Sequence, residues 1–248
     1  MTFSEAEVDR YARHLVLREI GGPGQQALKS ARVLIVGAGG LGAPAALYLA
    51  AAGVGALGIV DPDTVALSNL QRQVLYGVAD IGAPKAGAAA RRLGDLNPHV
   101  SIEAIARALS PANANALIAG WDIVLDGTDD FATRFAVNEA CVALGKPLVS
   151  GALGRWTGQV GVFQGRPCYR CLTPEIPPDA ETCAAVGVIG ALAGVTGAMM
   201  ALEAIKVIVG AGEPLAGRLL IYDALAAEAR TVRVIADPRC PVCGERGP

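Results

Sequence analysis

Short apolar runs alternate with segments of helical patterning over the first part of the chain. This alternation is typical of βαβ units and predicts an α/β protein with a Rossmann-like, doubly wound and mainly parallel sheet. The predicted strands are residues 32–37, 56–61, 101–106, 121–130 and 147–154, and the predicted helices are residues 8–20, 41–53, 84–96, 111–120 and 131–145.

The pattern changes after residue 154. Residues 156–165 (WTGQVGVFQG) predict a hairpin-like β segment, and residues 217–236 carry strand signals on both sides of a turn. A Pro-rich acidic loop, 172–183, and a long apolar helix lie between them. We expect one domain, 1–248, with a nucleotide-binding half to about residue 145 and, from about residue 146, an antiparallel half able to hold a macromolecular substrate.

The N-terminal segment predicts a helix that precedes the first strand. Ser4 and Glu7 have the spacing of a capping box before the helical residues 8–20, and GGPGQQ at 21–26 is expected to end that helix. The segment is polar and has no signal-peptide pattern, so we expect a cytoplasmic protein.

The segment 184–202 is uncharged and long enough to cross a membrane. Its glycines lower its hydrophobicity, Glu203 and Lys206 continue the same helix, and no basic cluster flanks it. We therefore expect a buried helix that packs closely through its glycines and no membrane span, with a span as the alternative. A net charge of −2 gives no sign of nucleic-acid binding.

Four of the six cysteines form two C-x-x-C pairs, Cys168 with Cys171 and Cys240 with Cys243. Cytosolic thiols stay reduced, so this spacing indicates a Zn²⁺ site near the C-terminus. Four thiolates fill a tetrahedral site, which makes the predicted role structural: the metal joins the C-terminal tail to the body. The alternative is two redox or structural thiol pairs.

The stretch VLIVGAGGLG at 33–42 has the G-x-G-x-x-G spacing of a phosphate-binding loop, formed by Gly37, Gly39 and Gly42. Asp61 ends the next apolar run, where an acidic side chain accepts hydrogen bonds from ribose hydroxyls. ATP and the redox dinucleotides share both groups. The motif therefore predicts the fold and a nucleotide without deciding which nucleotide.

The residues after Asp61 favour a triphosphate. Asn69, Arg72 and Gln73 follow closely, and Lys85 begins a helix. Two cations beyond a helix N-terminus exceed what a dinucleotide pyrophosphate needs. The alternative is that Arg72 and Lys85 are solvated surface charges.

Three aspartates in DGTDD, namely Asp126, Asp129 and Asp130, end the strand predicted at 121–130. That edge of an open α/β sheet is where ligands bind. Carboxylates near phosphates need an intervening cation, and Mg²⁺ takes one or two carboxylates together with phosphate oxygens. The alternative for Asp130 is a cap on the following helix.

Together these motifs resemble the MoeB/ThiF/HesA family of molybdopterin-synthase and thiamine-pathway sulfur-carrier adenylyltransferases, relatives of ubiquitin-activating enzymes. The resemblance covers essentially the whole chain, through RYARHLVL, GAGGLG, LSNLQRQ, PK, GTDD, CYRC, TCAAVGV and CPVC in that order. Two positions depart from the family: His14 stands where a glutamine is usual, and Asp130 where asparagine is frequent. The resemblance implies that Asp61 binds ribose, that Gly40 lies along the nucleotide, that Asn69, Arg72 and Lys85 bind phosphates, that Asp129 accompanies Mg²⁺, and that Arg13 enters the site of the neighbouring subunit in a homodimer.

The implied reaction is adenylation. The C-terminal Gly-Gly carboxylate of a small ubiquitin-like sulfur carrier attacks the α-phosphate of ATP and releases pyrophosphate, for sulfur transfer in molybdopterin or thiamine biosynthesis. A terminal carboxylate, with a pKa of about 3.5, is already ionised at neutral pH and needs no general base. This agrees with a chain that has only two histidines, His14 and His99. We expect positioning and charge neutralisation by Arg13, Arg72, Lys85, Asp129 and Mg²⁺.

Cys183 has two possible roles. In thioester-forming relatives, and in the thiamine branch, a cysteine in this loop can bond the activated carrier, whereas the molybdopterin branch passes the acyl-adenylate on without it. Neighbouring Glu181 would raise the pKa of the thiol and lower its reactivity. Cys141, within a helical pattern, is expected to be a small buried side chain.

Two other classes of protein remain open. An NAD(P)-binding oxidoreductase would share the glycine motif, but it would leave Arg72, Lys85 and Asp129 without a task. A non-catalytic, zinc-stabilised binding module would keep the cysteines but would not need the nucleotide-site residues. Binding of nicotinamide, or a lack of ATP binding, would favour one of these.

Overall fold

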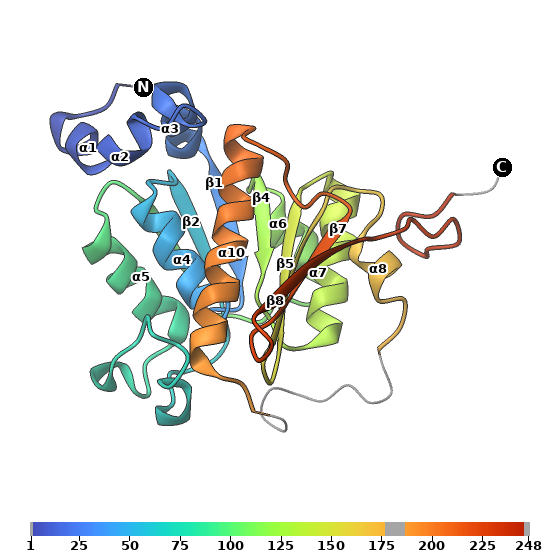
Figure 1. Ribbon diagram of the computed structural model, residues 1–248. Coiled ribbons are helices and arrows are strands. Elements are labelled where there is room, and N and C mark those ends of the chain that lie inside the picture. The colour runs from blue at the N-terminus through green and yellow to red at the C-terminus, as the bar shows by residue number, and fades with distance from the viewer. Residues whose placement is uncertain (1, 177–186, 246–248) are drawn as a thin grey trace.

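The computed structural model describes residues 2–176 and 187–245. One eight-stranded sheet runs through the molecule in the order β3-β2-β1-β4-β5-β6-β7-β8, and helices cover both of its faces (Figure 1). The strands are β1 Arg32–Val36, β2 Ala56–Val60, β3 Ser101–Ile105, β4 Ile123–Asp126, β5 Leu148–Gly154, β6 Thr157–Phe163, β7 Arg218–Asp223 and β8 Glu228–Arg233. The helices are α1 Glu5–Arg10, α2 Ala12–Leu15, α3 Gly21–Ser30, α4 Gly42–Ala51, α5 Lys85–Leu96, α6 Ala114–Ile118, α7 Phe131–Leu144, α8 Tyr169–Leu172 and α10 Gly190–Val209, with short 3₁₀ helices η1 Leu67–Asn69 and η2 Val78–Asp80.

The first half of the sheet is parallel and doubly wound, as predicted. β1 pairs in parallel with both β2 and β4, while β2 continues to β3 and β4 to β5. Side chains alternate across the sheet, so Val33 and Ile35 face α4, α5 and α10, whereas Leu34 and Val36 face α6 and α7. Burial of both faces explains why these strands are continuous apolar runs in the sequence.

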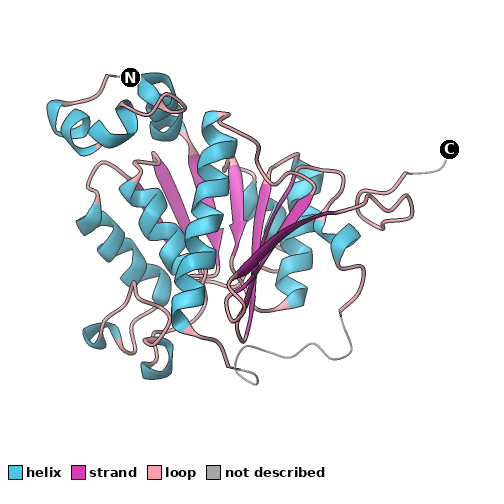
Figure 2. Ribbon diagram, in the orientation of Figure 1, coloured by secondary structure: helices cyan, strands magenta, loops and turns pink. Residues whose placement is uncertain are grey.

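The second half is antiparallel. The segment 156–165, predicted to be hairpin-like, contains one strand, β6, which forms a hairpin with β5. β7 and β8 extend the same sheet (Figure 2). Every residue of β8 is exposed, which is consistent with an edge strand. The prediction of a parallel sheet continued by an antiparallel segment is confirmed.

The N-terminal prediction was correct at its start and wrong at its end. Ser4 and Glu7 form the expected capping box, but the chain makes two short helices, and GGPGQQ begins α3 instead of ending a helix. Gly21 has a positive φ of 55° at the turn. Pro23 lies in the first helical turn, where its missing N–H would have no partner within the helix.

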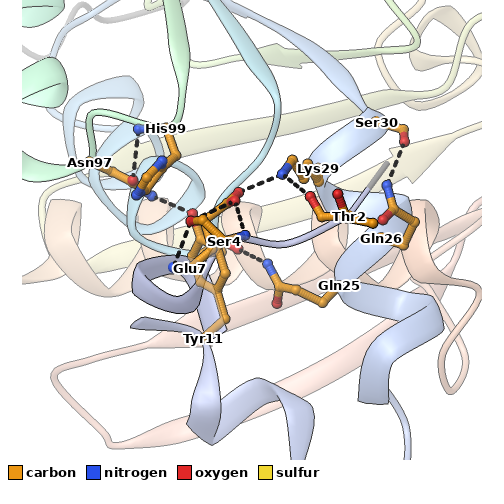
Figure 3. Close-up of polar contacts among 11 residues, drawn as sticks. Thr2, Ser4, Glu7, Tyr11, Gln25, Gln26, Lys29, Ser30, Asn97 and His99 are labelled. Carbon is orange, nitrogen blue, oxygen red and sulfur yellow. Dashed lines mark hydrogen bonds and ion pairs between the residues drawn. The ribbon is translucent and has the colours of Figure 1, made fainter. Parts of the chain in front are cut away.

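Polar contacts fix these N-terminal helices to the body (Figure 3). Lys29 forms an ion pair with Glu7 at 2.7 Å, and together with hydrogen bonds from Ser4 this lowers the pKa of Glu7 to about 2. Asn97, the residue after α5, donates to the hydroxyl of Tyr11 at 2.9 Å. Tyr11 therefore ties the α1–α2 segment to the C-terminal end of α5.

The long apolar helix α10 packs on the sheet. It contacts α4, β5 and β6, and one face from Leu192 to Ala204 is buried. A Cβ on Gly197 would collide with Pro44 and the carbonyl of Leu41, so at this position glycine allows the close packing that was predicted. By length and apolar composition alone α10 could span a membrane. In this structure 44% of its most apolar 18-residue stretch is buried against the rest of the protein.

Candidate nucleotide-binding site and cysteine cluster

A cavity of about 480 Å³ opens at the carboxyl ends of β1, β2 and β4. Its volume is in the range of small-molecule sites. It brings together ten of the residues singled out in the sequence: Gly37, Gly39, Gly40, Asp61, Asn69, Arg72, Gln73, Lys85, Asp129 and Asp130. Gly42 begins α4 behind the loop, and Arg13 is not among the residues that line the cavity.

The glycine loop has two positions at which a side chain would not fit. Gly37 has a φ of 86°, and a Cβ there would lie 3.1 Å from the Thr128 methyl group. A Cβ on Gly42 would collide with the carbonyl oxygen of Gly37. Gly39 and Gly40 have only ordinary contacts with the protein, so their lack of a side chain leaves room on the cavity side.

Asp61 is 5% exposed and holds the glycine loop. Its carboxylate accepts hydrogen bonds from the backbone N–H of Ala38 at 2.8 Å and of Asp63 at 2.9 Å. Burial raises the pKa of Asp61, although these bonds and the charge of Lys85 act in the opposite direction. The side chain thus has a structural role beside any contact with a ribose.

Lys85 is buried, so the alternative of a solvated surface charge is wrong for this residue. Its Nζ lies 2.9 Å from a carboxylate oxygen of Asp63, a residue that sequence reasoning did not select. Arg72 is half-buried, donates to the carbonyl of Ser68 at 3.1 Å, and runs beside Gly40. Arg72 therefore reaches the cavity from the segment between β2 and α5, and Lys85 reaches it from the first residue of α5.

Gln73 and Asn69 flank the same cavity. The Oε1 atom of Gln73 is buried and has no hydrogen-bond partner among the described residues. An unpaired buried acceptor is costly in a folded protein and is found where a ligand or a water completes the site. Asn69 caps its own turn, because its Oδ1 accepts from the N–H of Ala66 at 3.2 Å.

The three aspartates of DGTDD have three different environments. Asp126 is buried against Arg134, Ser150 and Thr128. Asp130 caps α7, accepting from Thr133 N at 2.8 Å, so the capping alternative is confirmed for it. Asp129 is exposed at the cavity, and its carboxylate makes no hydrogen bond or ion pair with any residue in the described part of the chain.

Sequence reasoning missed Arg134 and Tyr169, which also line the cavity. Arg134 is 5% exposed and lies on α7 four residues after Asp130. The signal available was an arginine, followed four residues later by Asn138, inside an otherwise mainly apolar helical segment. Such a polar pair on one face of a buried helix requires partners.

Arg13 lies far from the cavity of its own chain. It is exposed on α2, and the neighbouring Tyr11 is bonded to Asn97 beyond the C-terminal end of α5. Lys85 begins α5 at the cavity, and the 12 residues of α5 span about 18 Å. Arg13 could also have formed a surface ion pair with Asp9, but the described residues contain no such pair. The Nδ1 atom of neighbouring His14 lies 2.9 Å from Gln25 Oε1.

The four predicted cysteines come together beside α7. The Sγ atoms of Cys168 and Cys240 are 3.6 Å apart, those of Cys171 and Cys243 are 3.4 Å apart, and all four lie within 4.8 Å of one another. A tetrahedral zinc with Zn–S bonds of about 2.3 Å places its sulfurs about 3.8 Å apart, so the cluster fits that metal. Burial raises the pKa of the Cys240 thiol, but hydrogen bonds from the N–H groups of Cys243 and Val242 outweigh it and lower the pKa.

The two remaining cysteines differ. Cys141 is buried in α7, and burial raises its pKa to about 12, as expected for a small core side chain. Cys183, together with Glu181, lies outside the described residues, so both of its possible roles stay open.

Known proteins with similar sequences include adenylyltransferases, in agreement with the residues that line the cavity. A sulfur carrier protein adenylyltransferase of Thermus thermophilus is 50% identical, covering 99% of this chain and 94% of that protein. The molybdopterin-synthase adenylyltransferase of Escherichia coli is 47% identical over 98% of both chains. A crystal structure of E. coli MccB with ATP matches with a TM-score of 0.83 and 25% identity, covering 97% of this chain and 75% of that one. The ThiF family model matches residues 11–242, and the chain therefore belongs to the ThiF family.

Proposed function

We propose that this protein adenylates the C-terminal Gly-Gly carboxylate of a small ubiquitin-like sulfur carrier, giving an acyl-adenylate and pyrophosphate, in molybdopterin or thiamine biosynthesis. One observation carries the proposal. The cavity combines a glycine loop, a buried acid and two cations in a chain 50% identical to a sulfur carrier protein adenylyltransferase. We place this activity in the cytoplasm, where the thiols of the cysteine cluster stay reduced.

The residues of the cavity support a triphosphate substrate. The N-terminus of α4 and the N–H groups of the glycine loop provide a site for phosphate oxygens. Asp61 accepts from the ribose hydroxyls, while Arg72, Lys85, Asn69 and Gln73 contact the phosphates. The Oε1 of Gln73 has no partner among the described residues and fits a ligand donor or a bound water, whereas its Nε2 is the atom that can donate to a phosphate oxygen.

Asp129 fits a magnesium ion that accompanies ATP. Its carboxylate is exposed at the cavity and has no hydrogen-bond or ion-pair partner in the described residues, which leaves both oxygens available. Mg²⁺ supplies neutralisation of phosphate charge when bound. The carrier carboxylate is the nucleophile and is already ionised, so the side chains position the reactants and balance charge, and no proton transfer is required.

The antiparallel half from about residue 146 is proposed to hold the carrier. A second cavity of about 140 Å³ shares Arg134, Ala152 and Tyr169 with the nucleotide cavity and extends to residues of β6 and β7. A chain terminus lying along this path would reach the α-phosphate from the antiparallel side. Glycines suit such a path because they bring no side chain into it.

A homodimer is proposed because Arg13 does not line the cavity of its own chain. Apolar side chains are exposed on the side of α4 and α10, among them Tyr48, Val195 and Leu202. Leu67, Val74 and Val78 are exposed on the segment between β2 and α5, which carries Arg72. A second copy covering these residues would remove apolar surface from water and could bring Arg13 to the partner's cavity.

Zinc is proposed at one ion per chain in the cluster of Cys168, Cys171, Cys240 and Cys243. Because the chain supplies all four ligands, Cys240→Ser is expected to lower the unfolding temperature by about 10 °C, at roughly 2–4 °C per kcal/mol for a chain of this size. Thermal unfolding and elemental analysis measure the two effects. Cys141→Ala is the control, since it removes a buried thiol outside the cluster. Protein purified without chelator that contains no zinc would contradict the assignment.

The activity is tested by mixing the enzyme, Mg·ATP and each candidate carrier and measuring pyrophosphate. The expected result is release that requires a carrier with its terminal Gly-Gly, together with an acyl-adenylate adduct in the mass spectrum of the carrier. A carrier truncated by two residues is the control. Calorimetric binding of NAD(P) without binding of ATP would instead favour an oxidoreductase.

A further inference from the structure

Arg134 joins four parts of the fold at the edge of the cavity. Its guanidinium lies 3.6 Å from Asp126 Oδ2, at the end of β4. It donates to Ser150 Oγ at 3.3 Å and to the carbonyl of Gly151 at 2.7 Å, both in β5, and to the carbonyl of Thr128. The ring of Tyr169, at the start of α8, lies 5.9 Å from the guanidinium carbon.

The bond to Thr128 matters because the next residue is Asp129. The Asp129 carboxylate has no hydrogen bond or ion pair within the described ranges 2–176 and 187–245, although it interacts electrostatically with Arg134. Its position therefore depends mainly on the backbone that carries it. That backbone is held at Gly127, whose N–H donates to Val36 O at 2.9 Å. It is held again at Thr128, which donates from N and Oγ1 to Asp126 Oδ1, while Arg134 binds the Thr128 carbonyl.

Tyr169, whose ring packs over the guanidinium of Arg134, is held in place by Asn138. Asn138 lies one helical turn further along α7, on the same face. It accepts from the N–H of Tyr169 at 2.8 Å and donates to Cys168 Sγ at 3.6 Å. Tyr169, packed over Arg134, is thereby fixed to the cysteine cluster.

We propose that Arg134 is a positioning residue for the reaction: it fastens the Gly127–Asp130 loop to β5 and so fixes where the Asp129 carboxylate stands in the cavity. The proposal rests on the role assigned to Asp129 under the proposed function. A planar guanidinium suits this task, because Nη2 donates to the carbonyls of Thr128 and Gly151 while Nη1, at a fixed distance from it, donates to Ser150. A lysine has one nitrogen and cannot hold both positions of this fork.

The test is a double-mutant cycle between Arg134→Lys and Asp129→Asn, read as kcat and KM for carrier-dependent pyrophosphate release. Arg134→Lys is expected to lower kcat by about 100-fold, the cost of misplacing a group by about 1 Å, with little change in KM for ATP. In the Asp129→Asn background the same change is expected to cost less than about threefold, because the group being positioned is gone. Arg91→Lys, which alters an exposed pair with Asp80, is the control and should change neither constant.

Additive losses in the cycle, or an Arg134→Lys enzyme within threefold of the wild-type kcat, would overturn the proposal and leave Arg134 a structural ion pair. If Arg134→Lys does not fold, Asp126→Asn with Arg134→Gln removes both buried charges, and the same cycle is run on that pair. Amide exchange across residues 127–130 adds a readout independent of turnover and is expected to rise in either variant. A wild-type enzyme that releases no pyrophosphate with any carrier would count against the proposed function, whereas faster exchange in the variants would still support the loop assignment.

Discussion

Asp129→Ala is expected to reduce carrier-dependent pyrophosphate release by about 10³-fold and to leave the unfolding temperature within about 2 °C of the wild type. The large loss follows because removing one preorganised charge from a phosphate-transfer site costs about 10²–10³ in rate. The fold should be unaffected, because Asp129 is exposed and has no hydrogen bond or ion pair to lose among the described residues. Initial rates at saturating Mg·ATP, together with thermal unfolding, measure both quantities.

Asp130→Ala is the matched control for this variant. It removes the same charge one residue away, but Asp130 caps α7 through Thr133. Loss of a cap costs about 1 kcal/mol, or about 2–4 °C, and activity should stay within about threefold. Near-normal turnover of Asp129→Ala with Mg²⁺, or an equal loss of activity in Asp130→Ala, would show that the acid beside the metal was assigned incorrectly.

The sheet could be predicted from the sequence because its strands are buried on both faces. In a run such as RVLIV the four residues after the arginine are all apolar and buried, so the segment is recognisable as a buried strand. The succession of strands and helices along the chain therefore follows from hydrophobic patterning alone. The N-terminal helices could not be predicted in the same way. Gly21 and Pro23 look like a stop signal, yet a glycine with positive φ and a proline in the first turn also begin a helix.

The candidate site divides along similar lines. Residues in contiguous motifs, such as Gly37 and Asp61, reach the cavity because a strand end places them there. The cysteine pairs could be predicted to meet for a different reason: two C-x-x-C spacings indicate that distant segments bind the same metal ion. Arg134 escaped notice because its partners at Asp126 and Gly151 lie on two neighbouring strands, and the sequence does not contain that pairing.

The pairing of Lys85 with Asp63 shows a further limit of sequence reasoning. Lysine is usually a surface residue, so composition favours exposure. Here the start of α5 and the turn after β2 meet across an isolated bridge between Thr64 and Pro84, which buries the side chain beside an acid. The chemistry at this point depends on tertiary contact rather than on residue type.

The prediction with the clearest bearing on assembly concerns Arg13. Arg13→Ala is expected to lower the rate of pyrophosphate release by about 10³-fold if the guanidinium binds the phosphates of the partner's ATP. Arg18→Ala removes a neighbouring cation whose side chain is 94% exposed, and it should keep full activity. These single variants cannot tell whether the arginine acts on its own chain or on the neighbouring one.

Mixed dimers decide between the two arrangements. When Arg13→Ala and Asp129→Ala chains are co-refolded, each heterodimer contains one site with both wild-type residues and one site with neither, provided that Arg13 acts across the interface. Random pairing should then restore roughly a quarter of wild-type activity from two inactive parents. If Arg13 served its own chain, every site in the heterodimer would carry one lesion and activity would stay at the level of the parents. The structure favours recovery of activity in the heterodimer. The Tyr11–Asn97 contact lies beyond the C-terminal end of α5, whereas Lys85 begins this 12-residue helix at the cavity. Arg13 is therefore a helix length away from the phosphates in the cavity of its own chain.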